Sequence, residues 1–323
     1  MHPPTHFMFS FDKTYAVRAL DTYDSLHPTP YPVTFWFLCL DQESKTIIEK
    51  LHLPDAHCIT LEEMGNNALM RTRPARTNTE FAMSSKSAFM SFLLTSGRVK
   101  DGDALILSDV DIHFFPGAWD YIESMHKAKE HAIFMTPHHF PPHKEYLVQE
   151  VGFYNGGFIY FRINEVTKTC IHRYGREATE WTYLWHDYEN FRHSDQMYME
   201  YWRTLYDGFY EVTHKGVNVG TWNIENYKVT EDVKGNLFID EYPLICYHYH
   251  GLRLYFDRNG RIKPYPICVY NDKIYDAYVE SLQRAHEKLL AADPNWKYNI
   301  GKPPGILRLV KQKINKKLRE LKK

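Results

Sequence analysis

Alternation between short apolar runs and stretches of helical spacing dominates the first half of the chain, and it constrains the fold more than any other feature. Such alternation is typical of parallel strands joined by helices that cover a sheet. With 323 residues and 44% hydrophobic content, the chain has enough apolar material for one large core. The sequence predicts an α/β fold around a mixed, mainly parallel central sheet flanked by helices. We expect strands at 6–11, 31–40, 57–61 and 104–107, and helices at 15–26, 42–51 and 80–94.

The second half of the chain is more mixed. No internal repeat or low-complexity linker divides it, so we expect one domain over residues 1–300. The Lys-Pro-Pro-Gly stretch at 302–305 marks the boundary to a tail at 301–323. We expect further strands at 131–135, 152–162 and 244–249, and further helices at 164–185, 194–206 and 272–291.

An acidic pair, Asp109 and Asp111, follows directly on the apolar strand expected at 104–107. In open α/β sheets ligands bind at the carboxyl ends of strands, so both carboxylates lie where chemistry is expected. Two carboxylates one residue apart can approach one cation, directly or through water. They suit Mg²⁺ or Mn²⁺ rather than zinc or copper. The pair therefore predicts a site for a hard divalent cation that also binds phosphate oxygens.

Five segments resemble, in the same order, glycosyltransferases with the GT-A fold, particularly the retaining group that includes bacterial lipopolysaccharide galactosyltransferases and glycogenins. They are Phe-Ser-Phe-Asp-Lys-Thr-Tyr at 9–15, Leu-Ser-Asp-Val-Asp at 107–111, Tyr-Asn-Gly-Gly-Phe-Ile at 154–159, Ser-Asp-Gln at 194–196 and His-Tyr-His-Gly at 248–251. An ordered set is more specific than any single motif. The resemblance implies a Rossmann-like GT-A fold. It also implies transfer of a sugar from a nucleoside diphosphate, first of all UDP, to an acceptor hydroxyl.

The resemblance also implies roles on the donor side. Asp12 would contact the nucleotide base, Tyr15 would stack on it, and Asn155 would touch the sugar hydroxyls. Asp195 and Gln196 would lie beside the anomeric carbon as the catalytic residues. Structural alternatives exist for these patterns: Asp12 can cap a helix, Asn155 can open an Asn-Gly turn, and Asp195 can favour the start of a helix through its dipole.

His248 is the residue that the resemblance adds to the cation site, as a third ligand beside Asp109 and Asp111. The bound cation would act as a Lewis acid on the departing diphosphate. Lys86 or Arg253 would supply a further positive contact to the donor. A plain structural histidine is the alternative for His248, because the chain has 18 histidines.

Trp222, Asn223 and His250 are the candidates for the acceptor side. An accessible tryptophan gives a pyranose ring an apolar platform, whereas a core tryptophan is the alternative. The histidines at 138, 139 and 143 lie in a proline-rich loop whose spacing is not a zinc signature. We assign that group no role.

Two other functions compete with the transferase hypothesis. An Asp-x-Asp at a strand end also begins the site of metal-dependent phosphohydrolases and phosphotransferases. Those enzymes need a small hydroxyl residue shortly after the nucleophilic Asp, and here the residues after Asp111 are Ile112, His113 and Phe114. A non-catalytic carbohydrate-binding protein with the same fold is the second alternative.

Charge separates the tail from the rest of the chain. Residues 306–323 hold eight cations and one anion, a balance of +7, which leaves −8 for the remainder of a chain whose net charge is −1. Apolar residues recur there every three or four positions, so we expect a basic amphipathic helix. Such a helix can bind an anionic membrane surface or a protein partner. We expect no nucleic-acid partner for the acidic body.

The five cysteines are widely spaced and odd in number, which predicts neither a disulfide framework nor a zinc ribbon. No segment has the uninterrupted apolar length of a membrane span. We therefore expect a cytoplasmic protein. The acidic body and the cationic tail together favour a peripheral enzyme at the inner membrane face, whose acceptor is a glycan or a lipid-linked glycan.

Overall fold

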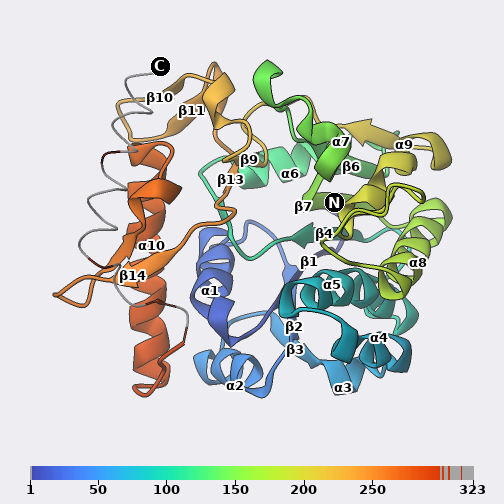
Figure 1. Ribbon diagram of the computed structural model, residues 1–323, viewed down its shortest axis with the longest axis horizontal. Helices are drawn as coiled ribbons and strands as arrows, with labels where there is room; N and C mark the ends of the chain where they lie inside the picture. The colour runs from blue at the N-terminus through green and yellow to red at the C-terminus, as the bar shows by residue number, and fades with distance from the viewer. Residues whose placement is uncertain (1, 299, 302–304, 306–313, 315–323) are drawn as a thin grey trace.

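A seven-stranded sheet forms the centre of the protein (Figure 1). The structure is a computed structural model, and it describes residues 2–298, 300, 301, 305 and 314. The strands lie in the order β3-β2-β1-β4-β7-β6-β8. Their bounds are β1 Thr5–Phe11, β2 Val33–Cys39, β3 Ala56–Thr60, β4 Ala104–Ser108, β6 Ile133–Pro137, β7 Tyr154–Arg162 and β8 Phe209–Glu211.

Most neighbouring strands of this sheet run parallel. β1 pairs in parallel with β2 and β4, as do β2 with β3 and β6 with β8, whereas β7 is antiparallel to β4 and β6. The predicted mixed, mainly parallel α/β sheet is confirmed. Strand order reverses between β1 and β4, and ligands bind at the carboxyl ends of strands at such a reversal. Asp12 follows β1 at this place, and Asp109 follows β4.

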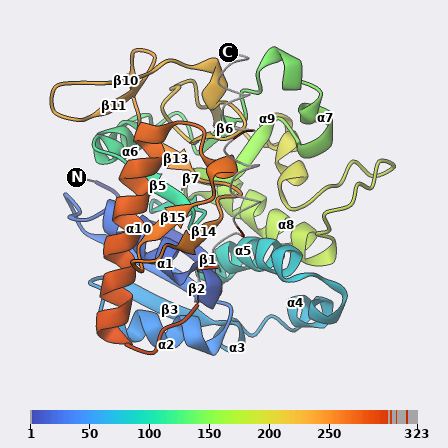
Figure 2. The same cartoon turned by 60° about the vertical axis from the view of Figure 1, so that its left-hand side comes forward.

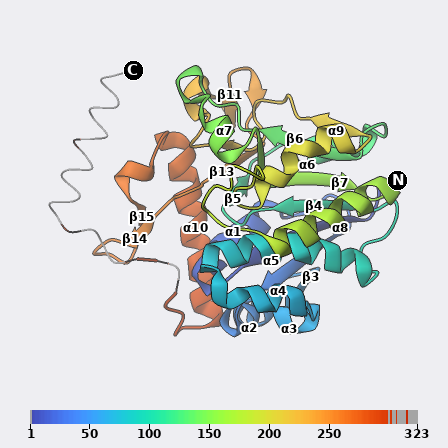
Figure 3. The same ribbon diagram turned by 45° about the vertical axis from the view of Figure 1, so that its right-hand side comes forward.

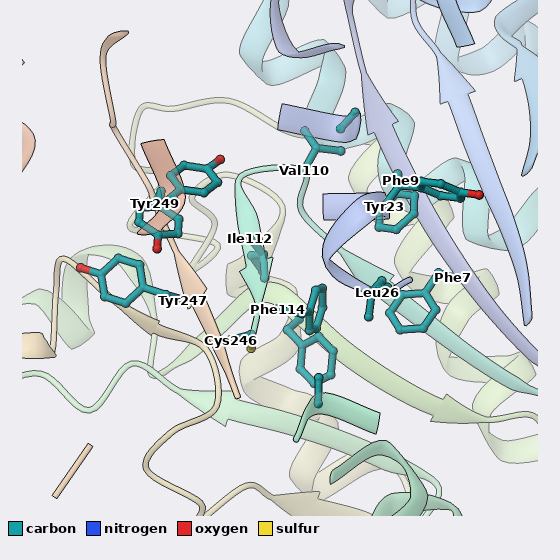
Figure 4. Close-up of a cluster of buried hydrophobic side chains, with 14 of the residues drawn as sticks. Phe7, Phe9, Tyr23, Leu26, Val110, Ile112, Phe114, Cys246, Tyr247 and Tyr249 are labelled. Atoms are coloured by element: carbon teal, nitrogen blue, oxygen red, sulfur yellow. The ribbon is translucent and has the colours of Figure 1, made fainter. Parts of the chain in front are cut away.

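Helices cover both faces of the sheet (Figures 1 and 2). Side chains alternate along β1, so Phe7 and Phe9 enter one apolar cluster and Met8 enters the other. Figure 4 shows part of the first cluster, including Phe7 and Phe9 of β1, Phe114 and the loop residue Val110. The first cluster includes buried side chains of α1 (Ala16–Ser25), α2 (Gln42–Leu51) and α10 (Asp272–Ala292), and the second includes those of α5 (Asn78–Thr95) and α8 (Glu165–Glu180).

Capping boxes fix the starts of α5 and α8, which lie side by side (Figure 3). The Thr77 hydroxyl accepts from the backbone N–H of Glu80, and the Glu80 carboxylate accepts from that of Thr77. Asn164 and Thr167 make the same reciprocal pair before α8. Such boxes satisfy N–H groups that a helix leaves without internal partners. The two starts set the position of Lys86 on α5 and Tyr174 on α8.

A small second sheet lies beside the carboxyl end of β4. It consists of β5 (Ile112–Phe114), β13 (Cys246–His248) and β9 (Val219–Gly220), with β13 in the middle. β13 runs antiparallel to β5, and its register pairs His248 with Ile112. The register therefore places His248 next to Asp111.

The remaining elements are shorter and lie around these sheets. The strands β10-β11-β12 form a three-stranded sheet, and β14 pairs with β15. These strands are β10 Val229–Glu231, β11 Leu237–Ile239, β12 Tyr242–Pro243, β14 Leu254–Phe256 and β15 Ile262–Pro264. The other α-helices are α3 Leu61–Met64, α4 Asn67–Thr72, α6 Ala118–Lys127, α7 Leu147–Val151 and α9 Trp202–Leu205. The 3-10 helices are η1 Lys13–Tyr15, η2 Arg73–Ala75, η3 Pro142–Lys144, η4 Gln196–Tyr201, η5 Ile224–Asn226 and η6 Pro266–Cys268.

Two predicted helices differ from the structure. The helix expected at 164–185 ends at Glu180, because Trp181 takes an extended conformation and opens an aromatic run with poor helix propensity. The helix expected at 194–206 is instead η4 followed by α9. Ser194 has a left-handed backbone (φ 50°) and cannot begin a helix.

The predicted basic amphipathic helix at 306–323 lies outside the described residues, apart from residue 314. The boundary at 302–305 also lies outside them, apart from residue 305. Over the part of the chain that the structure describes, no helix is both long and apolar enough to cross a bilayer.

Candidate active site

The acidic loop after β4 is held by backbone hydrogen bonds. The N–H of Asp109 donates to the carbonyl of Gly157 on β7 (2.8 Å), and the N–H of Tyr249 donates to the carbonyl of Asp111 (2.8 Å). The Thr22 hydroxyl on α1 lies 2.9 Å from the carbonyl of Val110 and 2.8 Å from that of Ile112. The loop therefore presents its two carboxylates from a fixed frame built by β7, α1 and the end of β13.

Asp111 and His248 lie in direct contact at this edge. His248 Nε2 is 3.1 Å from Asp111 Oδ1 and 3.9 Å from Asp109 Oδ2. Burial disfavours the imidazolium of His248, but Asp111 and Asp109 outweigh burial and raise its pKa. Burial likewise disfavours the Asp111 carboxylate, yet His248 lowers the pKa of Asp111 below its ordinary range. The structure thus brings together the three residues that the sequence predicted as cation ligands.

Lys86 links the acidic loop to Asp195. Its ammonium lies 3.0 Å from Asp109 Oδ1 and 3.4 Å from Asp195 Oδ2. Burial lowers the pKa of Lys86, but the two carboxylates outweigh this effect and raise it above the ordinary value. The Tyr174 hydroxyl on α8 donates to the same oxygen, at 2.9 Å from Asp195 Oδ2. A buried chain of charges and hydrogen bonds therefore runs from Asp109 to Tyr174.

Asn155 lies within β7 and does not form the Asn-Gly turn that was the structural alternative. Its side-chain oxygen accepts from the Asn218 amide (2.8 Å) and from the N–H of Gly157 (2.9 Å). Its amide nitrogen lies 3.2 Å from His138 Nε2. A Cβ at Gly157 would come within 2.6 Å of the His248 ring, so only glycine lets the strand approach the imidazole.

Gln196 begins η4 beside the same strand. Its amide nitrogen donates to the Val151 carbonyl (2.6 Å), and its oxygen lies 3.5 Å from the N–H of Gly156. Asp195 is buried at the start of η4, and its own side chain caps no N–H there. Its carboxylate instead contacts the Lys86 ammonium and the Tyr174 hydroxyl.

Asp12 and Tyr15 follow β1 at the mouth of the site. The Asp12 carboxylate caps η1, accepting from the N–H of Thr14 at 2.8 Å, so the structural alternative holds for this residue. The Tyr15 side chain is 42% exposed, which leaves its ring accessible to a flat ligand. Burial of its hydroxyl, followed by the nearby charge of Asp111, raises the pKa of Tyr15.

The two predicted positive contacts differ in their surroundings. Lys86 is within the cluster, whereas Arg253 is exposed and makes no ion pair with a carboxylate of the described residues. A third cation, Arg18, lies buried on α1 and was missed. Its guanidinium lies 4.8 Å from the centre of the Tyr15 ring and donates to the Leu252 carbonyl (2.8 Å). Its charge also favours the ionised form of Asp111.

Trp222 packs against the histidines of the site. Its ring centroid lies 5.2 Å from that of His248, with the planes at 88°, and 6.3 Å from that of His250. Asn223 is buried and donates to the carbonyl of His138 (2.9 Å), so its side chain is already engaged. His250 lies with Asp111 and His248, where one ligand atom from each lies within 4.8 Å of the others.

Sequence reasoning missed four residues that hold this site: Arg18, Tyr174, Asn218 and His138. Three of them come from segments with ordinary helical or loop patterns, so nothing in their spacing distinguished them. His138 belongs to the histidine group to which we assigned no role. In the structure it hydrogen-bonds Asn155 and stacks edge-on against Trp222, with ring centroids 5.5 Å apart.

No model of a known protein family matches the chain. Two proteins of Bacillus subtilis (strain 168) are similar to it over most of their length, and both are uncharacterized. YfnD is 26% identical over 301 residues, which cover 90% of this chain and 93% of YfnD. YfnF is 21% identical over 288 residues, which cover 86% of this chain and 92% of YfnF.

Two solved structures share the architecture. The galactosyltransferase LgtC, in complex with donor and acceptor sugar analogues, aligns with a TM-score of 0.56 at 13% identity, over 94% of this chain and 99% of LgtC. The bifunctional glycosyltransferase WbbM aligns with a TM-score of 0.52 at 13% identity, over 89% of this chain and 52% of WbbM. The chain has the GT-A glycosyltransferase fold.

Proposed function

We propose that the protein is a metal-dependent glycosyltransferase that moves a sugar from a nucleoside-diphosphate sugar, first of all a UDP-sugar, to an acceptor hydroxyl. The main support is that Asp109, Asp111, His248 and Lys86 lie together at the carboxyl end of β4 in a GT-A fold. Two carboxylates, an imidazole and an ammonium in one place suit a diphosphate that gains negative charge as the sugar leaves.

The donor set fits a divalent cation such as Mn²⁺ or Mg²⁺. Ligands at about 2.1 Å from one ion lie roughly 3–4 Å apart, which matches the separations of His248 Nε2 from Asp111 (3.1 Å) and Asp109 (3.9 Å). His248 Nε2 faces both carboxylates and is the ring nitrogen that a cation would take, whereas Nδ1 is buried without a hydrogen-bond partner among the described residues. A bound cation would act there as a Lewis acid on the leaving diphosphate.

Lys86 holds the two acidic groups of the site in place. It pairs with Asp109 on the diphosphate side and with Asp195 on the sugar side. When a donor binds, its phosphate oxygens can compete with these carboxylates for the ammonium. We infer that Lys86 both orients Asp109 and contacts the donor, whereas Arg253 is the weaker candidate because it is exposed and outside the cluster.

The remaining donor contacts follow from the order of the strand ends. Asp12 uses one carboxylate oxygen to cap η1, so the other is available for the base, and the half-exposed Tyr15 ring can stack on it. Asn155 and Gln196 lie on β7 and η4 next to the Lys86–Asp195 pair, on the side assigned to the sugar. We infer that Asp195 orients the donor sugar and that Gln196 faces the anomeric carbon.

The acceptor side is assigned to Trp222, whose ring is partly accessible next to His248. Asn223 is a weaker candidate, because its side chain already holds the His138 carbonyl. We infer a glycan acceptor. The lipid-linked form, and peripheral binding to the inner membrane face, rest on the basic sequence at 306–323 alone. Deletion of that segment should weaken binding to anionic vesicles, and unchanged binding in co-sedimentation would refute the membrane proposal.

Titration calorimetry with a panel of nucleoside diphosphates, with and without Mn²⁺, tests the proposal directly. We expect tight binding of one nucleotide, UDP first, only in the presence of the cation. A matched pair of variants, Asp109→Asn in the acidic loop and Asp101→Asn on the surface before β4, separates the site from general effects. Lack of any metal-coupled nucleotide binding by the wild-type protein would overturn the proposal.

A further inference from the structure

A second imidazole lies at the proposed cation site. Asp111, His248 and His250 each place one ligand atom within 4.8 Å of the other two. The sequence motif suggested only His248 for this role and left His250 to the acceptor. The centroids of the two imidazole rings are 5.9 Å apart with their planes at 84°, so the rings approach the same carboxylate from different directions.

The backbone after β13 explains why both histidines face the acidic loop. β13 ends at His248, and His250 lies two residues further on, in the turn that follows, where its ligand atom stays within 4.8 Å of those of Asp111 and His248. Tyr249 points the other way, into the core, where its ring stacks on that of Tyr278 with the ring centroids 3.7 Å apart. Its N–H also donates to the Asp111 carbonyl, which locks this short segment beside the carboxylate.

Trp222 supports the same arrangement. Its ring contacts His248 and His250 at once, with centroid distances of 5.2 and 6.3 Å. The ring approaches closely because residue 220 is glycine: a Cβ there would come within 2.5 Å of the indole. The indole therefore packs as a wall behind both imidazoles.

Asp109 differs from this group because Lys86 already holds it. Its Oδ1 is 3.0 Å from the Lys86 ammonium, and its Oδ2 is 3.9 Å from His248 Nε2. The group whose ligand atoms all lie within 4.8 Å of one another thus consists of one carboxylate and two imidazoles. Such a set is used for transition-metal ions and leaves coordination positions open for substrate oxygens.

We propose that His250 is a direct ligand of the divalent cation, together with Asp111 and His248, and that it gives the site its preference for a transition-metal ion over Mg²⁺. The inference rests on the proposed function and deepens it. Mg²⁺ takes oxygen ligands almost exclusively, whereas Mn²⁺ and the later ions also accept imidazole. Removing one imidazole therefore lowers affinity for Mn²⁺ more than affinity for Mg²⁺.

The test compares wild type, His250→Ala and a matched control, His57→Ala, in calorimetric titrations of Mn²⁺ and Mg²⁺ at saturating UDP. His57 is exposed, as His250 is, but it lies on edge strand β3, three strands away from β4. We expect His250→Ala to weaken Mn²⁺ binding at least about tenfold and Mg²⁺ binding by less than about threefold. His57→Ala should bind both ions as the wild type does.

Electron spin-echo spectra of the Mn²⁺ complex supply a readout that does not depend on turnover. Nitrogen modulation from two imidazoles is expected in wild type and His57→Ala, and from one in His250→Ala. An unchanged Mn²⁺ affinity and unchanged nitrogen modulation in His250→Ala would overturn the inference, and a raised acceptor KM alone would identify His250 as an acceptor contact. Failure of wild type to bind Mn²⁺ with any nucleoside diphosphate would instead overturn the proposed function together with this inference.

Discussion

The two ends of strand β4 each carry a histidine–aspartate pair, and the two pairs behave differently. At the amino end, His6 Nε2 lies 3.3 Å from Asp103 Oδ2, and His6 Nδ1 accepts a hydrogen bond from the Trp36 indole (3.2 Å). At the carboxyl end, His248 Nε2 lies 3.1 Å from Asp111, but its Nδ1 has no partner within the described chain. The first imidazole is fully satisfied by the protein, and the second is not.

Charge separates the pairs as well. Burial lowers the pKa of His6 and outweighs the attraction of its single carboxylate, Asp103. His248 faces two carboxylates, Asp111 and Asp109, which overcome burial and raise its pKa. A buried pair with matched hydrogen bonds serves stability, whereas an excess of negative charge around an unsatisfied ring is typical of a binding site. The following predictions test whether this contrast is functional.

The largest effect is expected from removing one charge at the carboxyl end. Asp111→Asn should lower metal-dependent donor turnover by at least about 100-fold, because it removes a carboxylate that holds both His248 and the cation. Turnover is measured as release of nucleoside diphosphate from a UDP-sugar at several Mn²⁺ concentrations.

The matched change at the amino end is Asp103→Asn. It should cost about 1 kcal/mol of stability through weaker hydrogen bonds to His6 and to the N–H of Lys100, while turnover stays within about twofold of wild type. Equal losses of turnover in both variants would show that the two ends of β4 do not differ in function.

Removing the buried ammonium at the carboxyl end should also lower stability. Lys86→Met leaves Asp109 and Asp195 without their shared cation, and breaking a buried ion pair in this way costs about 3 kcal/mol. Urea unfolding without divalent cations measures the loss. Added Mn²⁺ should restore part of it, because the cation would replace the missing positive charge.

Lys168→Met is the control for this change. Lys168 pairs with Asp101 and Glu165 on the surface, where an ion pair contributes about 0–1 kcal/mol. A similar loss of stability in the two lysine variants would mean that the ion pairs of Lys86 contribute no more than an exposed ion pair.

The hydroxyl behind the acidic loop should have a smaller effect. Thr22→Val removes the hydroxyl that donates to the carbonyls of Val110 and Ile112. Both carbonyls then stay buried without this donor, which should lower the free energy of unfolding by about 1–2 kcal/mol. We expect the looser loop to lower kcat by about tenfold with little change in donor KM. Thr46→Val, whose exposed hydroxyl donates to its own helix, should leave both parameters unchanged. Unaltered kcat in Thr22→Val would show that the loop does not need this support.

The sequence predicted the parts of the site that depend on strand ends. Asp12 and Asp109 follow apolar runs, and carboxyl ends of adjacent parallel strands meet at one edge, so their neighbourhood follows from the pattern. The contacts of Lys86 with Asp195 and Asp109 do not follow from the sequence pattern, because they depend on how α5 and α8 pack. Tyr174 looked like an ordinary aromatic residue on the buried face of a helix, and Arg18 lay in an amphipathic helix with no sign of burial.

The proximity of His248 to Asp111 was predicted from the family resemblance alone. It depends on the register of β13 against β5, which the residues between the two strands do not encode locally. The end of α8 was misjudged, because helical spacing continues past Glu180 while the aromatic run Trp181–Trp185 packs on itself. Tertiary contacts decide both features, and local patterns carry no record of them.

The smallest expected effect is the opposite shift of the pKa values of His6 and His248. In side-chain NMR titrations of the metal-free protein, we expect the His6 midpoint below the ordinary value of 6.5 and the His248 midpoint above it. A lowered pKa means that unfolding takes up a proton, so the contribution of His6 to stability falls as pH drops through 6.5. A raised pKa has the opposite sign: the contribution of His248 is complete below 6.5 and is lost as pH rises through its folded value.

Urea unfolding of His6→Gln and His248→Gln at about pH 5.5 and about pH 7.5, one unit either side of the ordinary histidine pKa, checks these signs. Relative to wild type, His6→Gln should lose more stability at the higher pH, and His248→Gln more at the lower. Added Mg²⁺ should bind the Asp109 and Asp111 carboxylates, which raise the pKa of His248, and so shift its midpoint downward, while that of His6 stays in place. If both variants lost more stability at the same pH, the contrast between the ends of β4 would be contradicted, because the two histidines would then have pKa values shifted in the same direction.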